Sequence, residues 1–276
     1  MKEHPDKHIR AAIDYALAQV WIFHPGGKSA HCFGRLICGM AHHPEHMMSI
    51  WSTPAVPINH ARQLIRMVDR CQPPTANKIH HQKDLAMALY NFTLTLSGVT
   101  VHTEGLEDAL HTAGCADALV CFYGTAVYLE FARESDSLER AILSAIADIE
   151  SAPALNARVE SVDSALVGLS DIAELAGLTR QAIALLKDGA RGSGQFPGPV
   201  QRVKGNSPLW RWKTVVRWLV MEGRLAEDSP LVAHAAVLDN LNLALQLSYA
   251  REQNRAALPS RARKSAPGFA DGRLDA

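Results

Sequence analysis

A polar segment at residues 73–89 divides the chain into parts of different composition. It begins with Pro73-Pro74 and lacks the apolar periodicity of a helix or a strand, so it is predicted to be a linker. A chain of 276 residues is long enough for two or three domains with cores of their own. The expected parts are a domain at 1–72, the linker at 73–89, domains at 90–161 and 166–222, a long helix at 229–257 and a disordered tail at 258–276.

Charge is distributed unevenly along the chain. Residues 1–86 contain 10 Lys and Arg against 6 Asp and Glu, and they hold 10 of the 13 histidines. Residues 87–160 contain 3 basic against 11 acidic residues, and residues 161–276 contain 15 against 11. The three segments therefore carry about +4, −8 and +4, although the whole chain is neutral. A basic segment beside an acidic one suggests an active unit and its neutraliser.

Composition favours a soluble cytoplasmic protein. No uninterrupted apolar run approaches the roughly 18 residues that a membrane span requires, so we expect no membrane partner. The polar start MKEHPDKHIRAA lacks the apolar core of a signal peptide. The cysteines are odd in number and have no framework spacing, so free, mostly buried thiols are expected. They are Cys32, Cys38, Cys71, Cys115 and Cys121.

The pattern of residues 4–71 predicts a small α+β domain. Apolar residues recur at helical spacing over 6–19, and three short strands follow in WIFHPGG, HCFGRLICG and MMSIWST. The segment PINHARQLIRMVDRC then predicts a second helix. The order helix, three strands, helix is the layout of a double-stranded-RNA-binding (dsRBD) fold.

The turn before the second predicted strand resembles that of HicA-like mRNA interferase toxins. It reads Gly26-Gly27-Lys28-Ser29-Ala30-His31, followed by Cys32-Phe33. The resemblance covers roughly 70 residues and implies a metal-independent endoribonuclease without cofactor, with mRNA as its partner and His31 as its catalytic residue.

These residue types suit RNA cleavage. A proton must move between the 2′-hydroxyl and the leaving oxygen, and histidine titrates near working pH. Lys28, beside a turn rich in backbone N–H groups, can bind a phosphate. The further candidates for RNA contact are Gly26, Gly27, Ser29, Arg35, Arg62 and Arg66.

Two departures from the toxin pattern allow an inactive copy instead. Gln19-Val20-Trp21 stands where such toxins often have a glycine, and the loop 39–47 is longer and richer in histidine. That loop also raises zinc as an alternative, against solvated histidines and buried thiols. The spacing is not a standard zinc pattern. The candidate ligands are Cys38, His42, His43, His46 and Cys71, with Cys32 less favoured.

Residues 90–161 predict the order β-α-β-β-α-β, which is the ferredoxin-like pattern. Strands are expected at 90–99, on both sides of Gly124-Thr125 and at 155–161, with helices at 104–113 and after Ser137. The segment contains no catalytic constellation. Its acidic residues are either a solvated surface or a face that covers a basic, RNA-binding one.

Residues 166–222 predict a helix-turn-helix unit. Ser170 is expected to cap a first helix, Gly177 to make the turn, and 180–187 to form the recognition helix. With F-P-x-P and S-P-L-W-x-W following, the segment resembles MerR- and AlpA-like winged DNA-binding domains. The resemblance implies operator DNA as a partner, and the alternative is a helical hairpin that binds protein. The candidate DNA-binding residues are Thr179, Arg180, Gln181, Lys187 and Arg191.

Residues 229–257 predict one long helix whose wide apolar face must be buried on the preceding domain or against a second copy. Helix-turn-helix regulators usually read two half-sites, so we expect a homodimer.

Together these patterns predict a fused type II toxin–antitoxin protein that represses its own operon. The link would hold the inhibitor at high effective concentration. The alternative is a transcription regulator whose N-terminal domain binds nucleic acid without cleaving it.

Overall fold

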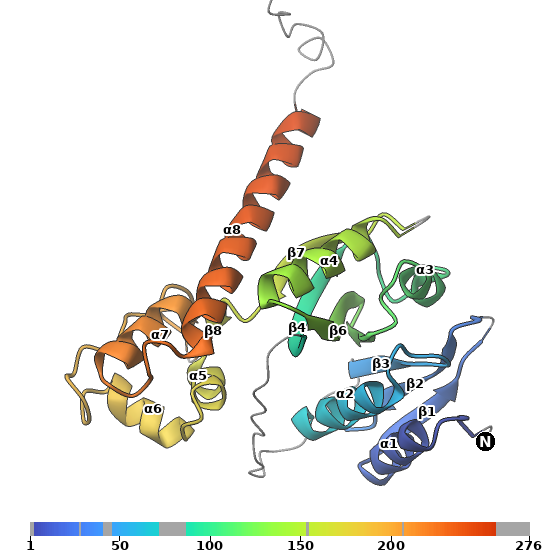
Figure 1. Cartoon of the computed structure of the whole chain (residues 1–276), viewed down its shortest axis with the longest axis horizontal. Helices are drawn as coiled ribbons and strands as arrows, with labels where there is room; N and C mark the ends of the chain where they lie inside the picture. Colours follow the sequence, from blue (N-terminus) through green and yellow to red (C-terminus); the bar gives the residue numbers. More distant parts are fainter. Residues whose placement is uncertain are drawn as a thin grey trace, which may run out of the picture.

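The computed structural model describes residues 3–27, 29–40, 46–71, 87–152, 155–205 and 207–257, with side chains up to Arg251. Within these residues the chain is mixed α+β, with an antiparallel seven-stranded sheet and eight helices (Figure 1). None of the helices in the described ranges has both the length and the apolar character needed to cross a bilayer. The tail expected to be disordered lies outside these ranges.

The N-terminal unit has the element order that the sequence predicts. Asp6 starts α1 by accepting hydrogen bonds from the backbone N–H groups of His8 and Ile9. Proline suits the first turn of a helix, where its missing N–H has no partner, and Pro57 begins α2. The elements are α1 (Lys7–Ala18), β1 (Trp21–Pro25), β2 (Cys32–Cys38), β3 (His46–Trp51) and α2 (Pro57–Arg70).

Two backbone positions explain features of this sequence. Val20 lies between α1 and β1 with a φ of 68°, a conformation that favours glycine. Val20 belongs to the stretch Gln19-Val20-Trp21, in which the sequence departs from the toxin pattern that it resembles. Gly26 closes the β1–β2 hairpin by donating to the carbonyl oxygen of Phe33 at 2.9 Å. A Cβ at Gly26 would lie 2.2 Å from the carbonyl oxygen of Cys32, so this glycine is required by the hairpin itself.

The middle unit also follows its predicted order, although β4 begins inside the predicted linker. Ser137 caps α4, as expected, by accepting from the backbone N–H of Arg140. The elements are β4 (Ala88–Ser97), α3 (Leu106–Thr112), β5 (Ala118–Tyr123), β6 (Ala126–Ser135), α4 (Leu138–Glu150) and β7 (Arg158–Asp163).

The two units share one sheet, with the strand order β1-β2-β3-β5-β6-β4-β7. The junction is the antiparallel pair β3–β5, in which Met47 lies opposite Phe122 and Met48 opposite Cys121. Pairing these two edge strands removes an exposed row of backbone donors and acceptors from each unit.

The helices cover opposite faces of this sheet, α1 and α2 on one face and α3 and α4 on the other (Figure 1). Strand β5 is buried on both faces: Leu119 and Cys121 join the core under α2, whereas Val120 and Phe122 join the core under α3 and α4. Conversely, Trp51 of β3 belongs to the core of the middle unit. Each unit therefore contributes side chains to the hydrophobic core of the other.

The C-terminal unit is helical and has its own core. Trp210, Trp212 and Trp218 are buried in it. The predicted cap Ser170 is wrong: the helix begins at Leu169, because the side chain of Asp171 accepts from the backbone N–H of Gly168 at 2.8 Å. The elements are β8 (Leu166–Val167), α5 (Leu169–Leu175), α6 (Arg180–Lys187), β9 (Trp210–Arg211), α7 (Trp212–Met221) and α8 (Pro230–Ala257).

Helix α8 connects the C-terminal unit to the sheet. Leu238, Leu241 and Leu245 pack against the core of the middle unit. The Asn242 side chain accepts from the backbone N–H of Val162 at 3.0 Å and donates to its carbonyl oxygen at 2.8 Å. It thereby satisfies one residue of the edge strand β7.

Candidate functional site

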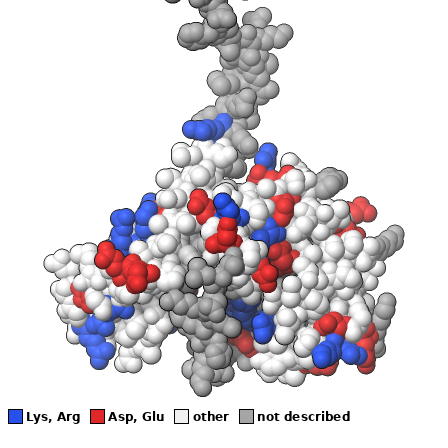
Figure 2. All heavy atoms as spheres, in the orientation of Figure 1, with Lys and Arg blue, Asp and Glu red and all other residues white. Residues whose placement is uncertain are grey.

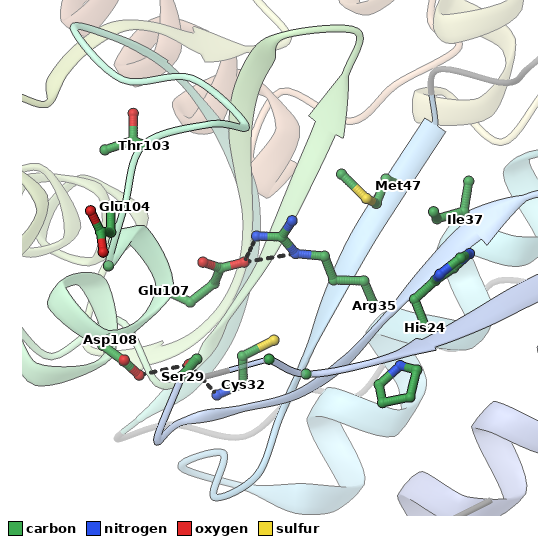
Figure 3. A pocket seen from close by; sticks show the side chains of 14 residues that line it. His24, Ser29, Cys32, Arg35, Ile37, Met47, Thr103, Glu104, Glu107 and Asp108 are labelled. Atoms are coloured by element: carbon green, nitrogen blue, oxygen red, sulfur yellow. Dashed lines mark hydrogen bonds and ion pairs between the residues drawn. The ribbon is translucent and has the colours of Figure 1, made fainter.

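A cleft of about 580 Å³ separates the β1–β2 hairpin of the N-terminal unit from α3 of the middle unit (Figure 3). Its size falls in the range of small-ligand sites. Four of the residues predicted to contact RNA lie on one wall, and carboxylates of the middle unit lie on the other. The lining residues used below are His24, Gly26, Gly27, Ser29, Arg35, Glu104, Glu107 and Asp108.

Helix α3 presents acidic residues to this cleft because of its periodicity. Leu106 and Leu110 are one turn apart and are fully buried in the core of the middle unit. Glu107, Asp108 and His111 lie on the opposite side of the helix and contact the N-terminal unit. The packing of the two leucines thus fixes where the two carboxylates point.

Asp108 accepts hydrogen bonds from three consecutive residues of the N-terminal unit. Its donors are the Ser29 hydroxyl at 2.8 Å, the Ala30 backbone N–H at 3.3 Å and the His31 backbone N–H at 2.9 Å. Burial alone would raise the pKa of Asp108, but these hydrogen bonds outweigh it and lower the pKa below its ordinary value. The carboxylate is therefore held in its charged form.

Glu107 pairs with Arg35, the basic residue in the middle of β2. The guanidinium donates to Glu107 Oε1 from Nε at 3.0 Å and also from Nη2. The hydroxyl of Ser49 donates to the same oxygen at 2.9 Å. Glu107 is only 6% exposed, so its carboxylate is largely withdrawn from water, whereas the Arg35 side chain is 32% exposed.

His31, the predicted catalytic residue, faces the same helix. Its ring stacks on the ring of His111, with centroids 4.0 Å apart and planes inclined by 8°. His111 Nε2 lies 2.9 Å from the carbonyl oxygen of Thr53, a distance that fits a hydrogen bond donated by the ring. One side of the His31 ring is therefore covered by the middle unit.

Two predicted RNA contacts do not join this site. Arg62 and Arg66 lie on α2, which covers the face of the sheet opposite to Arg35. Strand side chains alternate between faces, so the two arginines cannot share a surface with Arg35. Arg66 instead donates to the side chain of Asn91 at 2.8 Å. Lys28 lies outside the described residues.

The zinc alternative is not supported by the described residues, which contain no group of three or more His, Cys, Asp or Glu able to hold a metal. His46 Nδ1 lies 3.2 Å from Cys71 Sγ. Burial and the neighbouring Cys38 raise the pKa of Cys71 above its ordinary value. His42 and His43 lie outside the described residues.

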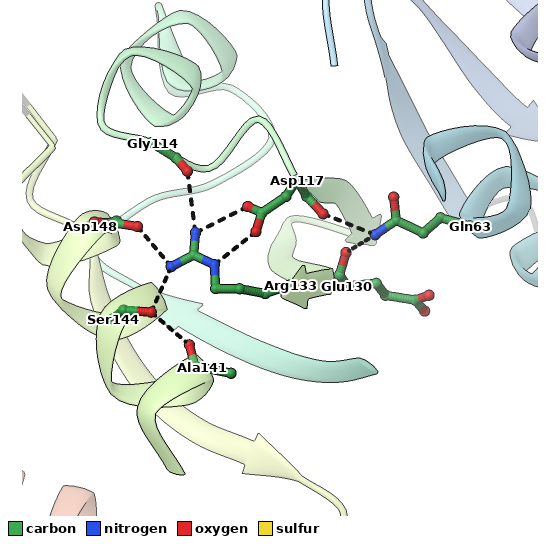
Figure 4. Close-up of polar contacts among 8 residues, drawn as sticks. All are labelled: Gln63, Gly114, Asp117, Glu130, Arg133, Ala141, Ser144 and Asp148. Atoms are coloured by element: carbon green, nitrogen blue, oxygen red, sulfur yellow. Dashed lines mark hydrogen bonds and ion pairs between the residues drawn. The ribbon is translucent and has the colours of Figure 1, made fainter. Parts of the chain in front are cut away.

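Further polar contacts join the two units on the other side of the sheet (Figure 4). The side-chain amide of Gln63 donates to the backbone carbonyl oxygens of Asp117 at 3.2 Å and Glu130 at 2.7 Å. Arg70 pairs with Glu130 at 2.6 Å. On the face that α3 and α4 cover, the indole N–H of Trp51 donates to the carbonyl oxygen of Ala118.

The structure places the predicted DNA-binding residues on one exposed end of the C-terminal unit. Thr179 caps α6 by accepting from the backbone N–H of Ala182 at 3.1 Å, which leaves Arg180 and Gln181 exposed in the first turn. Lys187 forms an ion pair with Asp188, and Arg191 is exposed beyond the helix.

A hairpin follows these residues. Gln201 and Leu209 exchange backbone hydrogen bonds at 3.2 and 3.0 Å. The hairpin carries Arg202 and Lys204, both exposed. Figure 2 shows basic side chains at the outer end of the molecule that α6 and α7 form.

No protein-family model, no curated protein and no solved structure matches the chain.

Proposed function

We propose that the chain is a self-neutralised toxin–antitoxin protein. The N-terminal unit acts as a HicA-like endoribonuclease of the dsRBD-fold type, and the middle unit is its antitoxin. The C-terminal unit binds operator DNA and represses the operon that encodes the chain.

The observation that carries this proposal is the contact of α3 with the segment Ser29–His31. Asp108 takes up the hydroxyl and backbone N–H groups of this segment, and Glu107 takes up the Arg35 guanidinium. The sequence resemblance implies a catalytic role for His31, and Ser29 and Arg35 are among the predicted RNA contacts. A domain that inhibits the toxin is expected to contact these residues, whereas a domain without an inhibitory role is not.

The strand order also supports the proposed architecture. In the middle unit the sheet runs β5-β6-β4-β7, with α3 following β4 and α4 following β6 along the chain, which fits a ferredoxin-like arrangement. In the C-terminal unit, α5, Gly177 with a φ of 64° and α6 fit a helix-turn-helix, and the 200–209 hairpin fits a wing.

In the proposed reaction, His31 moves the proton between the 2′-hydroxyl and the leaving oxygen, and Arg35 binds the neighbouring phosphate. Arg35 is free to bind a phosphate only after α3 withdraws, because Glu107 pairs with it. Withdrawal of α3 also uncovers the side of the His31 ring on which His111 stacks. Lys28 is proposed to contribute a further phosphate contact.

Removing the two carboxylates should release the ribonuclease activity. We expect full-length Glu107→Ala/Asp108→Ala to arrest growth and degrade mRNA in a host cell, and the wild type to do neither. Adding His31→Ala should lower cleavage by about 10²- to 10⁴-fold, the usual contribution of a general acid or base. The measurement is cleavage of labelled RNA by purified protein, together with growth of the expressing cells.

The matched control is Glu104→Ala. Glu104 is an exposed carboxylate of the same unit and lines the same cleft. This variant therefore removes a negative charge from the cleft but keeps the contacts of α3 with the 29–31 segment. A folded double variant that leaves RNA intact would contradict the ribonuclease, and the protein would then be a DNA-binding regulator with an inert N-terminal unit.

DNA binding is tested separately on α6. We expect Arg180→Ala to weaken binding to DNA from upstream of the chain's own reading frame by about 1–3 kcal/mol and to relax sequence preference. Arg191→Ala should instead weaken binding to all sequences and reduce its salt dependence, as loss of a phosphate contact does. Fluorescence anisotropy at several salt concentrations measures both effects. Unchanged binding in both variants would favour a helical hairpin that binds protein.

A further inference from the structure

We propose that Ser29, Ala30, His31 and Arg35 form a phosphate-binding cradle, and that Asp108 and Glu107 fill it as internal substitutes for the phosphate. This inference deepens the proposed function, on which it rests for the identity of its ligand, a phosphodiester group of single-stranded RNA.

The donors converge from one short segment. The backbone N–H groups of Ala30 and His31 and the hydroxyl of Ser29 all point to one carboxylate. Ser29 Oγ already accepts from the backbone N–H of Cys32 at 2.9 Å. The Ser29 hydroxyl has a single proton, and it donates this proton to Asp108. Successive backbone N–H groups of this kind bind phosphate in many proteins.

Arg35 provides the positive charge beside these donors. Two of its guanidinium nitrogens donate to Glu107, a fork that equally suits two oxygens of a phosphate. Ser49, opposite Arg35 in the β2–β3 register, donates to the same carboxylate oxygen. Each donor of the cradle therefore has an anionic oxygen as its partner, and each of those oxygens belongs to the other unit.

The surroundings favour an anion with a larger body attached. Hydrogen bonds from the cradle keep Asp108 ionised, so the cradle stabilises negative charge at this position. The cleft extends from the two carboxylates along His24 and Met47, which leaves room for the nucleoside on one side of a phosphate (Figure 3).

The test replaces the internal anion by an external one. In Glu107→Ala/Asp108→Ala, inorganic phosphate should raise the unfolding temperature saturably and shift the backbone amide resonances of Ala30 and His31. Sodium chloride of equal ionic strength should do neither. Wild type and the Glu104→Ala control should show no saturable shift, because their cradle is occupied. Adding Arg35→Gln should weaken the phosphate affinity by about tenfold, the loss of one charge-assisted contact.

An uncleavable 2′-O-methyl oligoribonucleotide distinguishes the two sources of phosphate. If it shifts the same resonances and competes with inorganic phosphate, the cradle binds the RNA backbone. If phosphate binds and the oligonucleotide does not, the cradle stands as a free-phosphate site and the ribonuclease proposal fails. If a folded double variant, or the milder Asp108→Ala variant, shows no phosphate-dependent shift at Ala30 and His31, the cradle is wrong, even where RNA cleavage is observed.

Discussion

Replacing Arg133 by methionine is expected to lower the free energy of unfolding by about 3 kcal/mol, as the breaking of a buried ion pair does. Methionine keeps most of the side-chain length but removes the charge and every donor. The loss should appear as a lower urea midpoint with an unchanged denaturant slope.

The size of this effect follows from the number of partners that Arg133 satisfies. Its guanidinium donates to both carboxylate oxygens of Asp117 at 2.7 and 3.0 Å, and to Asp148 at 2.8 Å. It also donates to the Ser144 hydroxyl and the Gly114 carbonyl oxygen (Figure 4). Burial alone would lower the pKa of Arg133, but the two carboxylates raise it above its ordinary value. Without the arginine, both aspartates would be left half-buried and unpaired.

Arg140→Met is the matched control for this prediction. Arg140 pairs with Asp136 on the surface of the same unit, and its side chain is 74% exposed. An exposed pair at this spacing contributes about 0.3–0.5 kcal/mol, so the two variants should differ clearly. Equal losses would mean that the Arg133 network adds nothing beyond a surface ion pair.

Most helices and strands could be predicted from the sequence because their causes are local. The alternation over 90–99 and the helical spacing over 6–19 agree with β4 and α1 to within about two residues, which is ordinary boundary uncertainty. Ser170 shows the limit of such reasoning. A serine before an apolar run suits a helix cap. The side chain of Asp171 is longer than that of serine and accepts from the backbone N–H of Gly168, so the helix starts earlier than predicted.

The shared sheet was not predicted, although the sequence contains its signal. The strand ALVCFY is apolar at nearly every position, whereas a strand with one solvated face alternates. Its second apolar face meets α2 of a unit that lies before the predicted linker. Pairing between two edge strands depends on contacts far apart in sequence, and no local periodicity specifies the partner.

The candidate site was predicted on one side only. The Gly26–His31 turn predicts the N-terminal wall. For the acidic residues of the middle unit the sequence leaves open a solvated surface or a face that covers a basic one, and it does not single out residues 107 and 108 among them. The spacing of Glu107, Asp108 and His111 opposite Leu106 and Leu110 marks a polar face on a short amphipathic helix. Arg62 and Arg66 were grouped with Arg35 because charge alone does not reveal which face of a sheet a residue occupies.

Trp51→Ala is expected to cost about 3–5 kcal/mol and to uncouple the two units, because a buried aromatic side chain is replaced by a cavity. Trp51 is fully buried, belongs to the core of the middle unit although it lies on β3, and donates to Ala118 of β5. We therefore expect that cutting a protease site introduced into the 73–86 segment leaves wild-type fragments associated on size-exclusion chromatography.

In the cut Trp51→Ala protein the fragments should separate, and RNA cleavage should then appear only after separation. Trp218→Ala is the matched control: Trp218 is 6% exposed in the separate core of the C-terminal unit, so its loss should destabilise that unit and leave the fragments together. Co-elution of the cut Trp51→Ala fragments would show instead that the β3–β5 pairing and the contacts of Gln63, Arg35 and Asp108 hold the units together without the indole. Release of the proposed toxin would in that case require α3 to move, because neither a cut in the linker nor a cavity in the shared core would expose His31.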